Sequence, residues 1–168
     1  MLGGSAIAVL LAGWACGGGG SAATFPEEAE CPAPAPLATS RARPGTVSAE
    51  SYLRRVQSFS QNLSHLRANL RAKYKDDTFY RRDEFRPDFA DYASQTVCTA
   101  EAILQLSPPD SRYAAYDSAL DAALTDLIEH TRFGREAVRS RNVSEYREWF
   151  KGADARISAV TAASANVP

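Results

Sequence analysis

The spacing of apolar residues over the last three quarters of the chain is the feature that most constrains its fold. Between residues 48 and 75, one apolar or aromatic side chain follows another at steps of three or four positions. This is the period of an α-helix that buries one face. The residues of this first stripe are Tyr52, Val56, Phe59, Leu63, Leu66, Leu70 and Tyr74.

Three further helices follow from the same periodicity and from the breaks between the stripes. A second helix is expected from Pro87 to about residue 106, because proline is tolerated in the first turn of a helix. Residues 107–110 hold two prolines, which end that helix and open a third one that runs to about Ser140. Residues 142–145 resemble a capping box and open a fourth helix. Because the links are very short, residues 46–168 are predicted to form an all-α, antiparallel up-down-up-down four-helix bundle.

The inward faces of these helices predict the core. Trp149 is expected at the edge of the buried face of the fourth helix and not in the core. The only polar groups on the inward stripes are Thr96, Thr131 and tyrosine hydroxyls, so the core is expected to be dry. The side chains expected to be nearly fully buried are Leu63, Leu66, Leu124, Leu127, Phe150 and Ile157.

The N-terminus has the pattern of an export signal. Residues 6–12 form a short apolar segment, far below the roughly 18 residues of a membrane span, and small residues follow it. Cys16 comes next and is followed by the run Gly-Gly-Gly-Gly-Ser. This arrangement resembles the N-terminus of bacterial lipoproteins, in which a cysteine after the signal peptide is lipidated and becomes the new first residue.

The resemblance implies a signal peptide over residues 1–15, a lipid anchor at Cys16 and a location in the bacterial cell envelope. Gly13 and Trp14 stand where the family usually has a leucine and a small residue. Ordinary secretion, with cleavage after Ala15 or Ala23, therefore stays open. The helical part, residues 48–163, is similar to the helical domain of many uncharacterised bacterial lipoproteins, which implies a fold and a location and no activity.

Residues 16–45 are rich in glycine, serine and proline and show neither helical nor strand periodicity, so we expect a disordered tether. The chain has three cysteines, and two remain once Cys16 carries lipid. Cys98 is predicted on the outer face of the second helix, and Cys31 lies in the tether. In an oxidising compartment these two are predicted to form a disulfide, with two free thiols as the alternative.

Several classes of function are disfavoured. With 19 basic and 20 acidic residues the formal charge is −1, which argues against nucleic acid as a partner. His65 and His130 are predicted on the outside of the bundle, and no carboxylate points inward, so neither a metal nor another cofactor is expected. The acidic pairs near residues 76 and 83 alternate with arginines and are interpreted as a solvated loop. We therefore do not expect an enzyme.

Two features suggest binding. Phe133 lies opposite the core stripe of its helix and is a candidate partner surface. Four tyrosines on inward stripes could line a ligand pocket: Tyr52, Tyr113, Tyr116 and Tyr146. The leading hypothesis is a non-enzymatic, lipid-anchored helical bundle of the cell envelope that acts as a binding or structural module for an unknown partner. The alternative is a binding protein that holds a small apolar ligand between its helices.

Overall fold

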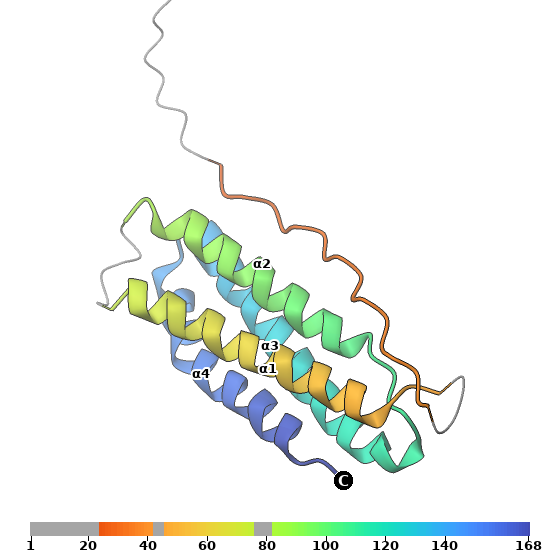
Figure 1. Cartoon of the computed structure of the whole chain (residues 1–168). Helices are drawn as coiled ribbons and strands as arrows, with labels where there is room; N and C mark the ends of the chain where they lie inside the picture. The colour runs from red at the N-terminus through yellow and green to blue at the C-terminus, as the bar shows by residue number, and fades with distance from the viewer. Residues whose placement is uncertain (1–23, 42–45, 76–81) are drawn as a thin grey trace, which may run out of the picture.

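The structure, a computed structural model, describes residues 24–41, 46–75 and 82–168 and shows an antiparallel four-helix bundle over them (Figure 1). The predicted all-α fold is confirmed. Helix α1 packs on α2 and α4, and α3 packs on the same two neighbours. Over the described ranges, no helix is long and apolar enough to cross a membrane. The elements are α1 (Ala49–Lys73), α2 (Phe85–Leu104), the 3-10 turn η2 (Ser111–Tyr113), α3 (Ala114–Arg139) and α4 (Val143–Ala165).

The helix starts are set by local capping. Ser48 caps α1, and its hydroxyl accepts a hydrogen bond from the Ser51 N–H at 3.4 Å. Helix α2 begins at Phe85, two residues before the predicted Pro87, because the first N–H groups of a helix have no partner and proline is tolerated among them. The prolines at 108 and 109 do not open α3. A 3-10 turn capped by Asp110 intervenes, so α3 starts only at Ala114.

The link between α3 and α4 is a tight turn around Arg141. This residue has φ = 59°, in the left-handed region. The N–H of Asn142 donates to the Ala137 carbonyl at 2.8 Å, and the N–H of Arg141 donates to the Val138 carbonyl at 3.3 Å. These two bonds form a Schellman motif, which usually has glycine at the left-handed position. The Asn142 side chain then caps α4 through the Glu145 N–H, as predicted.

The buried residues confirm which face of α1 and α3 packs into the core, but on α4 they differ from the prediction. Leu63, Leu124, Leu127 and Ile157 are buried as expected, whereas Leu66 is only half-buried. On α4 the roles of two neighbours are reversed, because Trp149 is 1% exposed and Phe150 is 36% exposed.

The correction on α4 has a cause on the facing helix. A Cβ atom at Gly134 would lie 2.5 Å from Trp149 Cγ, so the indole occupies space that any other residue at 134 would fill. Trp149 thereby packs in an aromatic cluster, and its ring centroid lies 4.7 Å from that of Phe89. The other buried aromatic residues of this cluster are Tyr74, Phe85, Tyr92 and Tyr146.

The interior is less dry than predicted, because Arg67 on α1 is only 4% exposed. Its guanidinium lies 5.0 Å from the Trp149 ring centroid and 4.9 Å from that of Phe150. Its Nε donates to Asp154 at 2.7 Å, which supplies the counter-charge from α4. Ser60 and Ser164 are also buried. A long arginine stem packs like an apolar side chain, and a stripe analysis that counts only apolar residues misses it.

Residues 24–41, here called the strap, run in an extended conformation along the outside of the bundle beside α2 (Figure 1). At its far end the strap reaches the start of α1, where Thr39 forms an isolated β-bridge with Val47. The Ala38 N–H donates to the Ser51 hydroxyl at 3.2 Å. This part of the expected tether is therefore packed against helices. The rest of that range, residues 16–23 and 42–45, and the predicted signal peptide, residues 1–15, lie outside the described residues.

Candidate functional site

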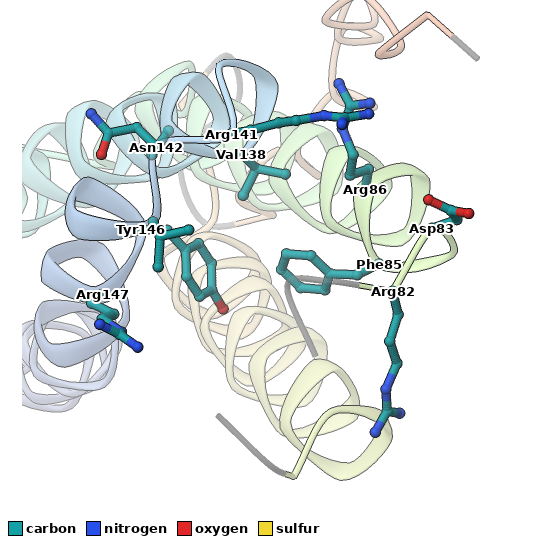
Figure 2. A pocket seen from close by; sticks show the side chains of 11 residues that line it. Arg82, Asp83, Phe85, Arg86, Val138, Arg141, Asn142, Tyr146 and Arg147 are labelled. Carbon is teal, nitrogen blue, oxygen red and sulfur yellow. The ribbon is translucent and has the colours of Figure 1, made fainter. Parts of the chain in front are cut away.

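A pocket of about 580 Å³ opens at one end of the bundle, where the start of α2, the end of α3 and the start of α4 meet. Phe85 and Tyr146 form its apolar floor together with Val138 (Figure 2). The two aromatic rings are buried and meet edge to face, with 5.4 Å between their centroids. The antiparallel topology creates this site, because it brings three helix ends to the same pole of the molecule.

The rim of the pocket is strongly basic. Four arginines line it, together with one carboxylate, Asp83. In Figure 2 Arg86 and Arg141 extend along the same side of the pocket. The four arginines are Arg82, Arg86, Arg141 and Arg147.

Two of these arginines form no ion pair with the residues that the structure describes. Within the described ranges, no carboxylate lies within ion-pair distance of Arg86 or Arg141. Arg86 donates from Nη2 to the Arg139 carbonyl at 3.4 Å, and its Nε is buried without a hydrogen-bond partner among the described residues. A buried N–H without a partner costs free energy, which an anionic oxygen at this position would recover.

Arg141 is also in an uncommon backbone conformation. An L-residue other than glycine, asparagine or aspartate rarely adopts φ = 59°, and the left-handed region costs it about 1–2 kcal/mol. Such residues persist where the surroundings or a function require the side chain. Here the strained residue is one whose guanidinium lines the pocket.

The floor is chemically inert at neutral pH. Burial is the main reason that the pKa of Tyr146 is raised well above its usual range, and the positive charge of Arg67 opposes that shift. The phenol therefore stays protonated and uncharged. The pocket offers fixed positive charge on its rim and apolar contact at its base.

The tyrosines predicted to line a ligand pocket do not surround one cavity. Tyr52, Tyr113 and Tyr116 cluster at the opposite end of the bundle, with ring centroids 6.1–6.4 Å apart. The Tyr52 hydroxyl donates to Asp117 at 2.5 Å, and the Tyr116 hydroxyl donates to the Ser164 carbonyl. Of the four candidate tyrosines, Tyr146 lines the arginine-lined pocket and the other three do not.

Phe133, the candidate partner surface, is half-buried and packs against the aromatic cluster. Its ring centroid lies 6.1 Å from that of His130. His130 is also half-buried and donates from Nε2 to the Trp149 carbonyl at 2.9 Å, so the interpretation of His130 as a solvated surface residue is wrong. Burial is the main cause that lowers the pKa of His130. His65 is exposed, as predicted.

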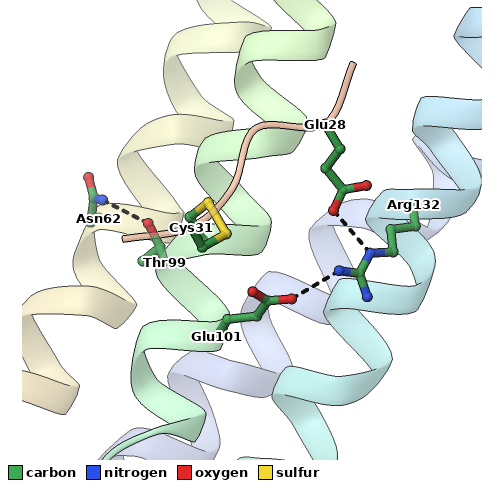
Figure 3. Close-up of a disulfide and its surroundings, with 7 residues drawn as sticks. Glu28, Cys31, Asn62, Thr99, Glu101 and Arg132 are labelled. Atoms are coloured by element: carbon green, nitrogen blue, oxygen red, sulfur yellow. Dashed lines mark hydrogen bonds and ion pairs between the residues drawn. A yellow bond between two sulfur atoms is a disulfide. The ribbon is translucent and has the colours of Figure 1, made fainter. Parts of the chain in front are cut away.

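The predicted disulfide between Cys31 and Cys98 is present and fastens the strap to α2 (Figure 3). Beside it, Arg132 on α3 binds Glu28 of the strap at 3.2 Å and Glu101 of α2 at 2.9 Å. The strap is therefore held by one covalent bond and by a bridge of charges. Cys16, the predicted lipidation site, lies outside the described residues.

Over the described residues, no group of three or more histidine, cysteine, aspartate or glutamate side chains is placed to hold a metal ion. The arginine-lined pocket was missed at the level of sequence because Arg82 and Arg86 were interpreted as part of a solvated loop. A signal was available, since positions 86, 141 and 147 all fall next to helix ends that the predicted topology brings together.

Comparisons of the chain with protein-family models, with curated proteins and with solved structures find no match.

Proposed function

We propose that this protein is a lipid-anchored helical bundle of the bacterial cell envelope that acts as a non-enzymatic binding module. Its ligand site is the pocket at the end of the bundle, and its ligand is an anion that carries an apolar part. The observation that carries the proposal is the combination of Arg86 and Arg141, which have no carboxylate partner in the described part of the chain, with a buried floor of Phe85 and Tyr146.

The chemistry of the pocket selects the ligand class. Guanidinium groups bind phosphate and carboxylate oxygens through paired, charge-assisted hydrogen bonds. The aromatic floor favours an alkyl or aryl group next to that charge. A volume of about 580 Å³ falls within the range of about 300–1,000 Å³ that is typical of small-molecule sites. The pocket supports this ligand better than the uncharged apolar ligand between helices that the sequence suggested.

The location in the envelope is supported by two observations. The N-terminal sequence around Cys16 resembles that of bacterial lipoproteins, and the Cys31–Cys98 disulfide suits a protein exported to an oxidising compartment. Fractionation of cells that express the wild type and Cys16→Ala tests the anchor. We expect only the wild type in the membrane fraction, with the added mass of lipid. Equal solubility and an unmodified mass for both would contradict the anchor.

Calorimetric titration of the full chain with octyl phosphate, below its micelle concentration, tests the ligand class. Octyl glucoside serves as the uncharged comparison and is expected to show no saturable binding. The double variant R86Q/R141Q should bind octyl phosphate at least about tenfold more weakly, because each charge-assisted hydrogen bond contributes about 1.5–3 kcal/mol and about 1.4 kcal/mol corresponds to a factor of ten.

A matched control removes two arginines elsewhere on the bundle. Arg54 pairs with Glu50, and Arg112 pairs with Asp110 at 2.8 Å; both arginines are exposed. R54Q/R112Q changes the net charge by the same amount and should keep the affinity within about twofold, because long-range effects of exposed charges are screened by salt. Equal affinity of wild type and R86Q/R141Q, or binding of octyl glucoside as tight as that of octyl phosphate, would contradict the proposal.

A further inference from the structure

The strap brings the N-terminal side of the chain to the same end of the bundle as the pocket (Figure 1). Phe25 lies beneath two guanidinium groups, with its ring centroid 5.5 Å from Cζ of Arg86 and 5.1 Å from Cζ of Arg135. Arg135 also donates a hydrogen bond to the Pro26 carbonyl. Because Arg86 is itself a rim residue of the pocket, the described chain begins, at Thr24, next to the site.

The attachment of the strap on this side is firm. Three residues after Phe25, Glu28 forms an ion pair with Arg132. Three residues further on, Cys31 forms the disulfide with Cys98. The strap then continues away from the pocket toward the start of α1. The contacts of Phe25 and Pro26 thus hold the first described residues at the pocket end, and the disulfide fastens the strap to the later part of α2.

The chain between the proposed anchor and the strap is short. Eight residue steps separate Cys16 from Thr24, which span at most about 26–29 Å when fully extended. Helix α3 has 26 residues and is about 39 Å long. A lipid on Cys16 would therefore keep the pocket end within reach of the membrane surface and hold it there at a high effective concentration.

Helix α3 is acidic at its start and carries a net positive charge in its last two turns. Helix α3 carries Asp117 and Asp121 in its first two turns, at the end away from the pocket. Its last two turns, next to the pocket, carry Arg135, Glu136 and Arg139, and Glu136 forms an ion pair with Arg139 at 2.7 Å. An anionic membrane surface attracts the basic end and repels the acidic one.

From this juxtaposition we propose that the pocket binds the phosphate of an anionic phospholipid in the membrane that holds Cys16. Arg86 and Arg141 contact the phosphate, and Phe85 and Tyr146 contact the apolar part of the lipid next to it. This inference rests on the proposed function, since it names the source of the anionic, partly apolar ligand. Because the strap begins at the pocket end, the lipid on Cys16 and the pocket would both attach the same end of the bundle to the membrane.

Flotation with lipid vesicles tests the source of the ligand. The full chain with Cys16→Ser has no lipid acceptor and is mixed with vesicles of phosphatidylcholine, alone or with about 30 mol% phosphatidylglycerol. We expect at least about fivefold more protein on the anionic vesicles, and the added substitutions R86Q/R141Q should remove most of that difference. The substitutions R54Q/R112Q remove the same charge at positions away from the pocket, so they should leave this difference within about twofold.

The outcomes separate this inference from the proposed function. If octyl phosphate binds the pocket but anionic vesicles retain no more protein than neutral ones, the ligand is a soluble anion and the membrane inference is wrong. If neither binds, both proposals are wrong. If R86Q/R141Q and R54Q/R112Q lower vesicle binding equally, overall charge accounts for the attraction, and the pocket is not the lipid site.

Discussion

Replacing Arg141 with glycine should stabilise the protein and at the same time weaken its ligand site. The residue holds φ = 59° in the turn between α3 and α4. That conformation costs an arginine about 1–2 kcal/mol and costs glycine nothing. Glycine also gives the unfolded chain more freedom, which offsets about 0.4–1 kcal/mol of the gain. The difference between these two ranges is a net increase in the free energy of unfolding of up to about 1.6 kcal/mol. Its midpoint of about 0.8 kcal/mol corresponds to a rise in Tm of about 2–3 °C for a chain of this size.

Arg141→Gln is the matched variant, because it removes the same charge and keeps the left-handed strain. Both variants should bind octyl phosphate more weakly and to a similar extent. Only Arg141→Gly should gain stability. The comparison separates the backbone role of position 141 from the role of its guanidinium.

The assay combines urea denaturation, followed by far-ultraviolet circular dichroism, with calorimetric titration of octyl phosphate. The Schellman hydrogen bonds, such as that from the Asn142 N–H to the Ala137 carbonyl, are made by the backbone and remain in both variants. If Arg141→Gly is no more stable than Arg141→Gln, the left-handed backbone at position 141 does not destabilise the wild type. If Arg141→Gly retains wild-type affinity, the Arg141 guanidinium does not bind the ligand.

Three further predictions concern the rest of the bundle. Gly134→Ala should lower the free energy of unfolding, measured by urea titration, by about 1–3 kcal/mol, because the added Cβ would lie 2.5 Å from Trp149 Cγ. An unchanged or higher stability would show that the indole moves at little cost. Burial lowers the pKa of His130 below 6.5, so the unfolded state binds more protons and stability falls as the pH drops below about 6.5. His130→Gln should flatten that decline, and an unchanged slope would contradict the assignment to this residue. Replacing Cys31 and Cys98 with serine should lower the free energy of unfolding by about 2–4 kcal/mol, since the disulfide closes a loop across 67 positions. An unchanged urea midpoint would mean that the strap is held without the disulfide.

Helical periodicity was sufficient to predict the number and order of the helices, since each stripe requires a partner and the short links leave only antiparallel neighbours. The disulfide followed from the count of cysteines, because exactly two remain if Cys16 carries lipid. The strap was not predictable from composition. Its proline-rich sequence shows no periodicity, and what fixes it is pairing with distant side chains such as Arg132 and Arg135.

The errors within the core have specific physical causes. Trp149 is buried in place of Phe150 because Gly134 on the facing helix leaves space for an indole, and a pattern within one helix carries no information about its neighbour. Arg67 is buried because Asp154 and two aromatic rings surround it, which again depends on α4. The pocket was missed for the same reason, since it exists only where three helix ends meet.

A nuclear magnetic resonance titration with octyl phosphate, followed through the arginine Nε–Hε signals, reports ligand binding at each arginine separately. We predict saturable shifts for Arg86 and Arg141, which line the pocket and have no carboxylate partner among the described residues. No comparable shift is expected for Arg112, which forms an ion pair with Asp110. Small shifts of similar size at all arginines, or the largest shifts at positions away from the pocket, would contradict this prediction.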